Sequence, residues 1–235
     1  MRNYPQKGFK WIMELFFPIR CLACNKYGKY LCRNCLRTIN ISTEFNCIGC
    51  NIPSNYGATC ENCRNKWHLD SLFICADYNN QIVSKLIHKM KYSYISECSK
   101  HLAEIAKEYI ERFPKNTFNH SAVIPVPLSP SRLNWRGFNQ AELIARSISK
   151  KIGAKMDADI LIRNIMRKPQ AQIKQKEERL INITDSFSVR QKRKFPVSVL
   201  LVDDVCTTGA TLNECARVLK QNGSVKVDAL VIARG

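Results

Sequence analysis

The sequence lacks any apolar run that approaches the roughly 20 residues needed to span a membrane. The nearest candidate is FKWIMELFFPI at 9–19, which Glu14 and Pro18 interrupt and which no small-residue cleavage site follows. We expect a short amphipathic helix there rather than a signal peptide. Its apolar face would pack against the rest of the protein through Trp11, Ile12, Leu15 and Phe16. The absence of a membrane span predicts a cytoplasmic protein.

Acidic residues are also scarce. The chain has 19 Asp and Glu against 37 Lys and Arg, which gives a formal net charge of +18. A positive surplus of this size favours polyanionic partners, most simply nucleic acid or a phosphorylated ligand. The alternative is a lysine-rich proteome that gives its proteins a generally basic surface.

Cysteine, by contrast, is abundant near the N-terminus. Eight of the twelve cysteines lie between positions 21 and 63, in four C-x2-C pairs. In a reducing cytosol such clustering favours metal thiolates over disulfides. After residue 63 the pattern changes to apolar strands that alternate with amphipathic helices. We therefore expect a metal-binding module over 1–67 and an α/β domain over 68–235.

The four cysteine pairs form an internal duplication. CLACN at 21–25 resembles CIGCN, which lies 26 residues later, and CRNC at 32–35 resembles CENC, which lies 28 residues later. Sequential pairing predicts one ion bound by Cys21, Cys24, Cys32 and Cys35 and a second bound by Cys47, Cys50, Cys60 and Cys63. A set of four thiolates favours zinc, so we expect one structural zinc ion in each set, with an iron–sulfur cluster as the alternative.

The metal-binding pattern carries further expectations about single residues. Asn25 and Asn51 follow the second cysteine of their pairs, where a positive φ is common. His68 is an alternative ligand, although a lone histidine after a complete set is expected to be a bystander. The remaining cysteines have no partner spacing and are expected to be small buried or semi-buried residues: Cys75, Cys98, Cys206 and Cys215.

Residues 68–235 show the alternation of an α/β domain with a parallel sheet. Strands are expected at 71–78, 122–127, 197–203 and 225–232, and helices at 80–92, 97–112, 139–152 and 210–221. Asn139 is the expected N-cap and Gly153 the expected C-cap of the helix at 139–152. The basic segment 163–194 is interpreted as a mobile loop with a short helix around 176–182.

The motif with the clearest chemistry is VLLVDDVCTTGAT at 199–211. Its apolar run ends in Asp203 and Asp204 at the carboxyl end of a buried strand, where ligands bind in open α/β sheets. Hydroxyls, small side chains and the N-terminus of the next helix then form a phosphate cradle, and Glu214 can close a capping box with Thr211. Because carboxylates repel phosphate, Asp203 and Asp204 are expected to bind another part of the same ligand. A ribose diol suits them, since it has two adjacent hydroxyl donors. The chain has no G-x4-G-K-[ST] loop, which excludes the magnesium site of a P-loop ATPase, and a capped surface helix is the remaining alternative.

This stretch resembles the phosphoribosyl pyrophosphate (PRPP) motif of type I phosphoribosyltransferases. The resemblance implies that Asp203 and Asp204 hold the ribose 2′ and 3′ hydroxyls and that Mg²⁺ accompanies the ligand. It assigns the 5′-phosphate to the loop that follows Val205 and Cys206, of which Cys206 occupies a variable position. That loop consists of Thr207, Thr208, Gly209, Ala210 and Thr211.

Over essentially its whole length the chain resembles the ComF family of competence-associated proteins. The resemblance is carried by the two Cys-rich ribbons, VIPVPLSPSRLNWRGFNQAELIA at 123–145, KPQAQ at 168–172 and the PRPP motif. It implies a type I phosphoribosyltransferase-like parallel sheet flanked by helices, with an N-terminal double zinc ribbon. It also implies that segment 163–179 closes over PRPP and that Arg136 contacts an anion. The implied pyrophosphate contacts are Pro127, Leu128, Ser129 and Arg132.

By this resemblance the chain is expected to bind PRPP and to assist imported single-stranded DNA in natural transformation, with the DNA-uptake helicase or translocase machinery as a further partner. The alternatives are an active phosphoribosyltransferase with an unidentified nitrogen acceptor, and a DNA-binding protein that PRPP regulates. The candidate nucleic-acid contacts are Arg20, Lys26, Lys29, Arg33, Arg136, Arg167 and Lys168. Aromatic residues interleave with the basic ones of the Cys-rich module and are able to stack on unpaired bases: Tyr27, Tyr30, Phe45, Tyr56 and Trp67.

Overall fold

The computed structural model describes residues 18–164, 185–190 and 194–235. The helix expected around 176–182, the segment 168–172, Arg167 and Lys168 lie outside the described residues, as does almost all of the helix expected at 9–19. Among the described residues, none of the helices combines the length and the apolar character that a membrane crossing requires.

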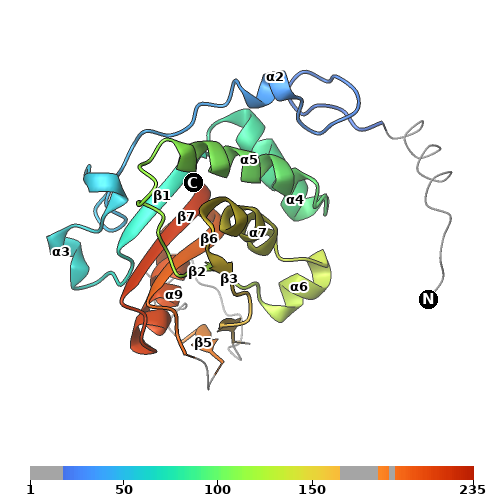
Figure 1. The fold of residues 1–235 in the computed structure, drawn as a ribbon. Coiled ribbons are helices and arrows are strands. Elements are labelled where there is room, and N and C mark those ends of the chain that lie inside the picture. The colour runs from blue at the N-terminus through green and yellow to red at the C-terminus, as the bar shows by residue number, and fades with distance from the viewer. Residues whose placement is uncertain (1–17, 165–184, 191–193) are drawn as a thin grey trace, which may run out of the picture.

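A five-stranded parallel sheet forms the centre of the molecule (Figure 1), in the order β1-β7-β6-β2-β3. The strands are β1 (Ser71–Asp77), β2 (Ala122–Pro125), β3 (Lys155–Met156), β6 (Ser198–Cys206) and β7 (Lys226–Arg234). All four neighbouring pairs are parallel. The apolar residues of β6 and β7 are buried along almost their whole length, as expected for central strands that are covered on both faces.

Helices cover both faces of this sheet (Figure 1). They are α4 (Gln81–Tyr92), α5 (Cys98–Glu111), α7 (Gln140–Ile152) and α9 (Ala210–Gln221). Alternate residues of β6 separate two apolar clusters: Leu200 and Val202 join the cluster of α4, α5 and α7, and Val199 and Leu201 join that of α9. The chain thus leaves β2 toward one face and β6 toward the other. The carboxyl ends of β2 and β6 are a topological switch point, where open α/β sheets bind their ligands.

The strands and helices expected in the α/β domain are present, with small differences at their ends. The cap predictions for α7 are confirmed, because Asn139 Oδ1 accepts a hydrogen bond from the Ala141 N–H at 3.1 Å and Gly153 has φ 72°. Strand β6 is longer than predicted and ends at Cys206, so both aspartates of the motif lie within it. Pairing with β7 up to Arg234 extends the strand, and sequence periodicity does not contain this information.

Several local predictions are wrong. The predicted loop at 163–194 contains a short strand, β5 (Phe187–Val189), which pairs antiparallel with β4 (Leu161–Arg163), and β4 overlaps the predicted loop only at Arg163. Their buried side chains join the apolar cluster of α9, so tertiary packing stabilises strands that propensity does not indicate. Helix α6 (Pro130–Arg136) was also not predicted. The capping box does not form, because the Glu214 carboxylate instead accepts from the Asp185 N–H at 2.8 Å and from Arg217.

The two Cys-rich units pack at different places around the sheet. The first contains α2 (Arg33–Leu36), and its Cys21 and Leu31 belong to the apolar cluster of α4 and α5. The second contains η1 (Asn55–Gly57) and α3 (Glu61–Arg64), and its Ile48 belongs to the cluster of α9. Figure 1 shows α2 above α5, whereas α3 lies at the left of the picture, beyond β1 at the edge of the sheet. The duplicated units therefore contact different parts of the α/β domain.

Candidate ligand pocket and metal centres

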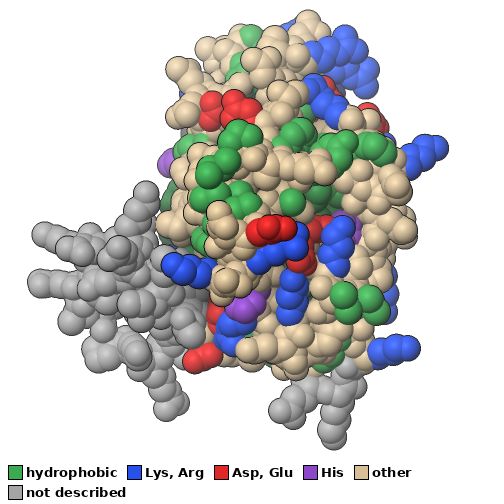
Figure 2. Space-filling model, turned by 90° about the vertical axis from the view of Figure 1, so that its left-hand side faces the viewer, with side chains coloured by type: hydrophobic (Ala, Val, Ile, Leu, Met, Phe, Trp, Pro, Cys, Tyr) green, Lys and Arg blue, Asp and Glu red, His purple; other side chains and the backbone are tan. Residues whose placement is uncertain are grey.

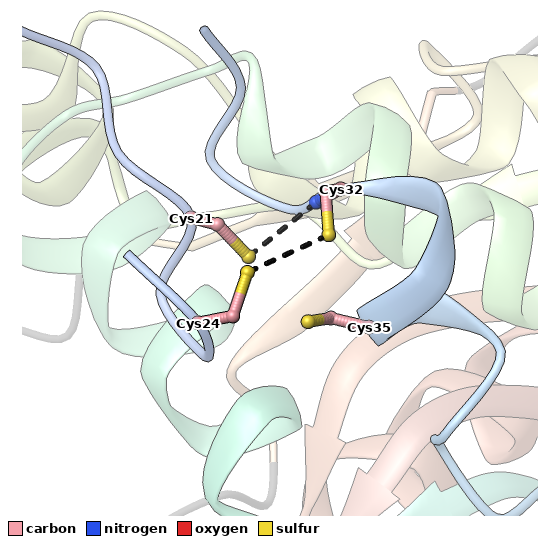
Figure 3. A group of neighbouring side chains, drawn as sticks. All are labelled: Cys21, Cys24, Cys32 and Cys35. Atoms are coloured by element: carbon pink, nitrogen blue, oxygen red, sulfur yellow. Dashed lines mark hydrogen bonds between the residues drawn. The ribbon is translucent and has the colours of Figure 1, made fainter. Parts of the chain in front are cut away.

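The cysteines assemble in the two groups that the duplication predicts. In each group the four Sγ atoms all lie within 4.8 Å of one another. Figure 3 shows the first group, in which the four side chains converge on one point. The Sγ atoms of Cys24 and Cys32 are 3.7 Å apart, as are those of Cys50 and Cys60. A tetrahedral zinc site with Zn–S bonds of about 2.3 Å has sulfur atoms about 3.8 Å apart. The residues therefore fit two zinc ions.

The backbone of each unit prepares its sulfurs for metal binding. Asn25 and Asn51 have φ of 59° and 61°, as predicted. The backbone N–H groups of Cys32 and Cys60 donate to the Sγ atoms of Cys21 and Cys47 at 3.5 and 3.4 Å. Burial by itself raises the pKa of the Cys21 thiol, but the backbone N–H groups of Cys24, Cys32 and Ala23 outweigh it and lower that pKa to about 6. Cys47, the equivalent residue of the second unit, also has its pKa lowered to about 6. A lowered pKa favours the thiolate, which is the metal-binding form, at Cys21 and Cys47. Side-chain hydrogen bonds with neighbouring cysteines raise the pKa of Cys35 and Cys63 to about 12.

The other cysteines and His68 take no part in these groups. Cys75, Cys98, Cys206 and Cys215 are at most 3% exposed, as predicted for core residues, and burial raises the pKa of each thiol. His68 is absent from both cysteine groups of the described chain, and its backbone N–H donates to Asn213 Oδ1 at 2.6 Å.

A pocket of about 400 Å³ lies at the switch point between β2 and β6. It brings together eight of the residues that the resemblance implicates: Pro127, Leu128, Arg132, Arg136, Asp203, Asp204, Val205 and Thr211. Residues without a predicted ligand role also line it: Lys91, Tyr92, Trp135, Asn139 and Arg163. Lys91 and Tyr92 carried no signal in the sequence, because only the packing of α4 brings its C-terminal end to this pocket.

The aspartate pair has an asymmetric environment. The Asp204 carboxylate is buried and forms an ion pair with Lys91 Nζ at 2.8 Å. Asp203 is half-buried, and its Oδ1 accepts a hydrogen bond from the Asp204 N–H at 2.8 Å. Burial, followed by the neighbouring charge of Asp204, raises the pKa of Asp203 to about 7, although Lys91 and Arg163 act in the opposite direction. The Asp203 carboxyl therefore gains or loses its proton near neutral pH.

The remaining residues of the predicted PRPP loop do not all face this pocket. Cys206 and Ala210 are buried, Thr208 Oγ1 accepts from the Ala210 N–H at 3.4 Å, and Gly209 is the N-cap of α9. Thr207 faces a second cavity of about 720 Å³, which it shares with Arg234. Ser129 is the N-cap of α6, where its Oγ accepts from the backbone N–H of Arg132 at 3.4 Å.

The candidate nucleic-acid contacts are separated in space. Arg20, Lys26, Lys29 and Arg33 are exposed on the first Cys-rich unit, whereas Arg136 lines the pocket. On the side of the molecule that carries α3, basic and acidic side chains lie beside one another (Figure 2), so the positive charge there is partly neutralised.

The aromatic residues of the Cys-rich module serve mainly in packing. Phe45 and Tyr56 form a cluster with Phe113, with ring centroids 5.5 to 5.6 Å apart. Trp67 packs beside the apolar cluster of α9. Tyr56 is still 43% exposed within its ring cluster. Tyr27 is 64% exposed, and the Arg20 guanidinium lies 4.3 Å from its ring centroid.

Comparisons with known proteins agree with these features. A family model described as a double zinc ribbon domain matches residues 12–77. The chain is 32% identical to competence protein F of Haemophilus influenzae, over 94% of this chain and 100% of the relative. It is 28% identical to the DNA utilization protein YhgH of Escherichia coli O157:H7, over 91% of this chain and 93% of the relative. A purine phosphoribosyltransferase from Pyrococcus horikoshii overlaps 61% of this chain and 84% of its own at 16% identity, with a TM-score of 0.31, which is too low to support any inference.

The predicted fold class is thus confirmed, with a parallel sheet between two layers of helices and two four-cysteine units near the N-terminus. The two cysteine groups match the double zinc ribbon in number and position. The relative from Haemophilus influenzae aligns over its full length, so the likeness extends to the sheet and its pocket as well as the ribbons. The chain belongs to the ComF family of competence-associated proteins.

Proposed function

We propose that this protein binds PRPP in the pocket between β2 and β6 and assists the handling of imported single-stranded DNA in the cytoplasm, with the DNA-uptake translocase machinery as a partner. The printed names of the relatives, competence protein F and DNA utilization protein, support the DNA role. The observation that carries the ligand assignment is the convergence of two aspartates and several cations on one pocket. Carboxylates and cations side by side suit a ligand that has both hydroxyl and phosphate groups.

Each part of PRPP has a chemically matched partner in this arrangement. Carboxylate oxygens of Asp203 and Asp204 accept hydrogen bonds from the ribose diol. Arg132 and Arg136, which enter from α6, offer charge-assisted hydrogen bonds to the pyrophosphate. Thr211 and the first-turn N–H groups of α9 suit the 5′-phosphate. Mg²⁺ prefers carboxylate and phosphate oxygens and is expected to enter with the pyrophosphate.

Calorimetric titration with PRPP and Mg²⁺ tests the ligand assignment. We expect Asp204→Asn and Arg132→Ala each to weaken binding at least tenfold. Glu108→Gln, an exposed position on α5, serves as the control and is expected to bind PRPP normally. The diol is tested directly with ribose 5-phosphate against 2-deoxyribose 5-phosphate. Equal affinity for the two sugars would contradict the role of the aspartates, and equal affinity of Asp204→Asn and the parent protein would contradict the site.

An active phosphoribosyltransferase is the second candidate function, and the state of Asp203 favours it. A carboxyl group with a pKa of about 7 exchanges its proton readily near neutral pH, as a general acid or base requires. This candidate predicts PRPP-dependent release of pyrophosphate in the presence of a nucleobase or ammonia. Asp203→Asn would abolish that release even at PRPP concentrations that saturate its weakened site. A protein that binds PRPP but releases no pyrophosphate with any of these acceptors would argue against turnover.

A further inference from the structure

Two exposed aromatic side chains line the pocket between β2 and β6, and a third contacts one of them; we call the three the aromatic rim. Tyr92, Tyr94 and Trp135 are 53%, 40% and 59% exposed. Tyr92 and Trp135 line the pocket, and the rings of Tyr94 and Trp135 meet edge to face with centroids 5.1 Å apart. Large apolar side chains gathered at one place on a surface indicate a binding site.

The backbone of Tyr94 supports a role beyond packing. Tyr94 has φ 55°, a left-handed conformation that a bulky residue rarely adopts. It lies in the short connection between α4 and α5, and its ring contacts Trp135 of α6 although it stays exposed. An unfavourable backbone conformation that holds an exposed side chain in place is typical of functional sites.

Cationic groups accompany these rings. The Arg136 guanidinium lies 5.9 Å from the ring centroid of Tyr92. Its Nε is buried and has no hydrogen-bond partner within the part of the chain that the structure describes. Arg132 is one turn earlier on α6 and is exposed. The rim therefore combines flat apolar faces with donors that are suited to phosphate oxygens.

We propose that the aromatic rim, together with Arg132 and Arg136, is where unpaired bases of a single nucleic-acid strand stack on the protein. Aromatic platforms beside a positively charged groove are the usual means of holding single strands, because every base has a flat face and each phosphate a negative charge. A duplex hides its base faces within the stack and cannot use such a platform. This inference rests on the proposed DNA role and locates it on α4 and α6.

The first Cys-rich unit is the competing surface, since the sequence places basic and aromatic residues together there. Among residues 18–37, however, Tyr27 is the one aromatic side chain that is exposed, and the Arg20 guanidinium already lies over its ring. That unit offers phosphate contacts and one exposed ring, whereas the rim offers three exposed rings, two of which are in contact and two of which line the pocket. We expect the Cys-rich unit to contribute to affinity without holding the bases.

Fluorescence anisotropy with a labelled 20-nucleotide oligothymidylate separates the two surfaces. We expect Trp135→Ala and Tyr92→Ala each to weaken binding about 5- to 150-fold, the range of stacking on one base. Trp135→Phe keeps an aromatic face and is expected to restore most of the affinity. Tyr27→Ala is the matched control, an exposed tyrosine beside an arginine, and is expected to bind within about twofold of the parent protein. Arg132→Ala is expected to reduce the slope of log affinity against log salt by about 0.7, which is the loss of one phosphate contact.

The outcomes separate this inference from the proposed function. If the parent protein binds no oligothymidylate, the rim proposal and the proposed DNA role both fail. If it binds, but Trp135→Ala and Tyr92→Ala bind equally well, or if Tyr27→Ala loses as much affinity, the rim proposal alone is overturned. Competition by thymidine monophosphate as effective as by the strand would make the rim a nucleotide subsite and would also overturn it. The last arm uses Tyr94→Ala, because Tyr94 belongs to the rim but is not among the residues that line the pocket. This variant should lose affinity for the strand, and PRPP affinity close to that of the parent protein would show that the loss concerns the strand.

Discussion

Ile48, inside the first C-x2-C turn of the second Cys-rich unit, packs against Gly209 at the start of α9. A Cβ atom at position 209 would lie 2.7 Å from Ile48 Cδ1 and 3.1 Å from Trp67 Cζ3. Gly209 also has φ +82°, which favours glycine. The second Cys-rich unit thus packs directly against the loop between β6 and α9. Among the described residues, the first Cys-rich unit makes no such contact with this loop, because it packs against α4 and α5.

Gly209→Ala is expected to destabilise the protein by more than the backbone conformation alone explains. A positive φ costs a non-glycine residue about 1–2 kcal/mol, and the close approach of Ile48 adds to this. Gly223→Ala is the matched control, because φ there is +108° and the nearest atom would lie 4.0 Å from the new Cβ. Urea denaturation should show the larger loss for Gly209→Ala, and Ile48→Ala should recover part of it in the double variant. Equal losses at 209 and 223 would mean that the contact with Ile48 has no energetic importance.

The two metal centres are expected to differ in what their loss exposes. Cys50→Ser removes a ligand of the second site and Cys24→Ser the equivalent ligand of the first, and both cysteines are exposed. Native mass spectrometry should find one zinc fewer in each variant. Hydrogen exchange at 207–213 should then increase in Cys50→Ser, because Ile48 and Trp67 no longer hold Gly209. Cys24→Ser should instead affect α4 and α5, and identical exchange patterns in the two variants would refute this division of roles.

Asp203 predicts a specific pH dependence of stability. Its pKa of about 7 in the folded protein exceeds the value of about 3.9 for an unperturbed aspartate, so the folded state binds a proton more tightly than the unfolded state. Its contribution therefore favours folding at low pH and is lost as the pH rises from about 4 to 7. Asp203→Asn removes this dependence. Between pH 5 and pH 8 the variant should gain stability relative to the parent protein, on the order of 1 kcal/mol after solvent screening. A constant difference across this range would show that Asp203 has an ordinary pKa.

Asn139 links the start of α7 to the end of β2, and its two functions are separable. Its Oδ1 caps α7, and its Nδ2 donates to the Val126 carbonyl at 3.1 Å. Asn139→Ala loses both and should destabilise the protein by about 1–2 kcal/mol in thermal or urea unfolding. Asn139→Asp keeps the capping oxygen and loses only the donor, so it should recover the capping part of the loss. If the two variants are equally unstable, the cap contributes little at this position.

Local features of this protein follow from its sequence. The C-x2-C spacing and its duplication predict both cysteine groups correctly, because each set of ligands depends mainly on turns within a few residues. The main strands and helices of the α/β domain also follow from apolar periodicity, and the caps at Asn139 and Gly153 from residue type. The eight motif residues that line the pocket come from ends of strands and from α6 and α9, so the parallel sheet brings them together as its topology requires.

The tertiary structure alone decides the contacts between distant segments. Lys91 pairs with Asp204, Tyr94 meets Trp135, and Ile48 rests on Gly209, and none of these pairs is close in sequence. Each depends on the path of a connection and on how whole helices pack. The strands β4 and β5 form for the same reason, since they are stabilised by each other and by α9 rather than by their own propensity. Short-range spacing fixes backbone turns, but side chains from separate elements meet only where burial of the shared core positions those elements.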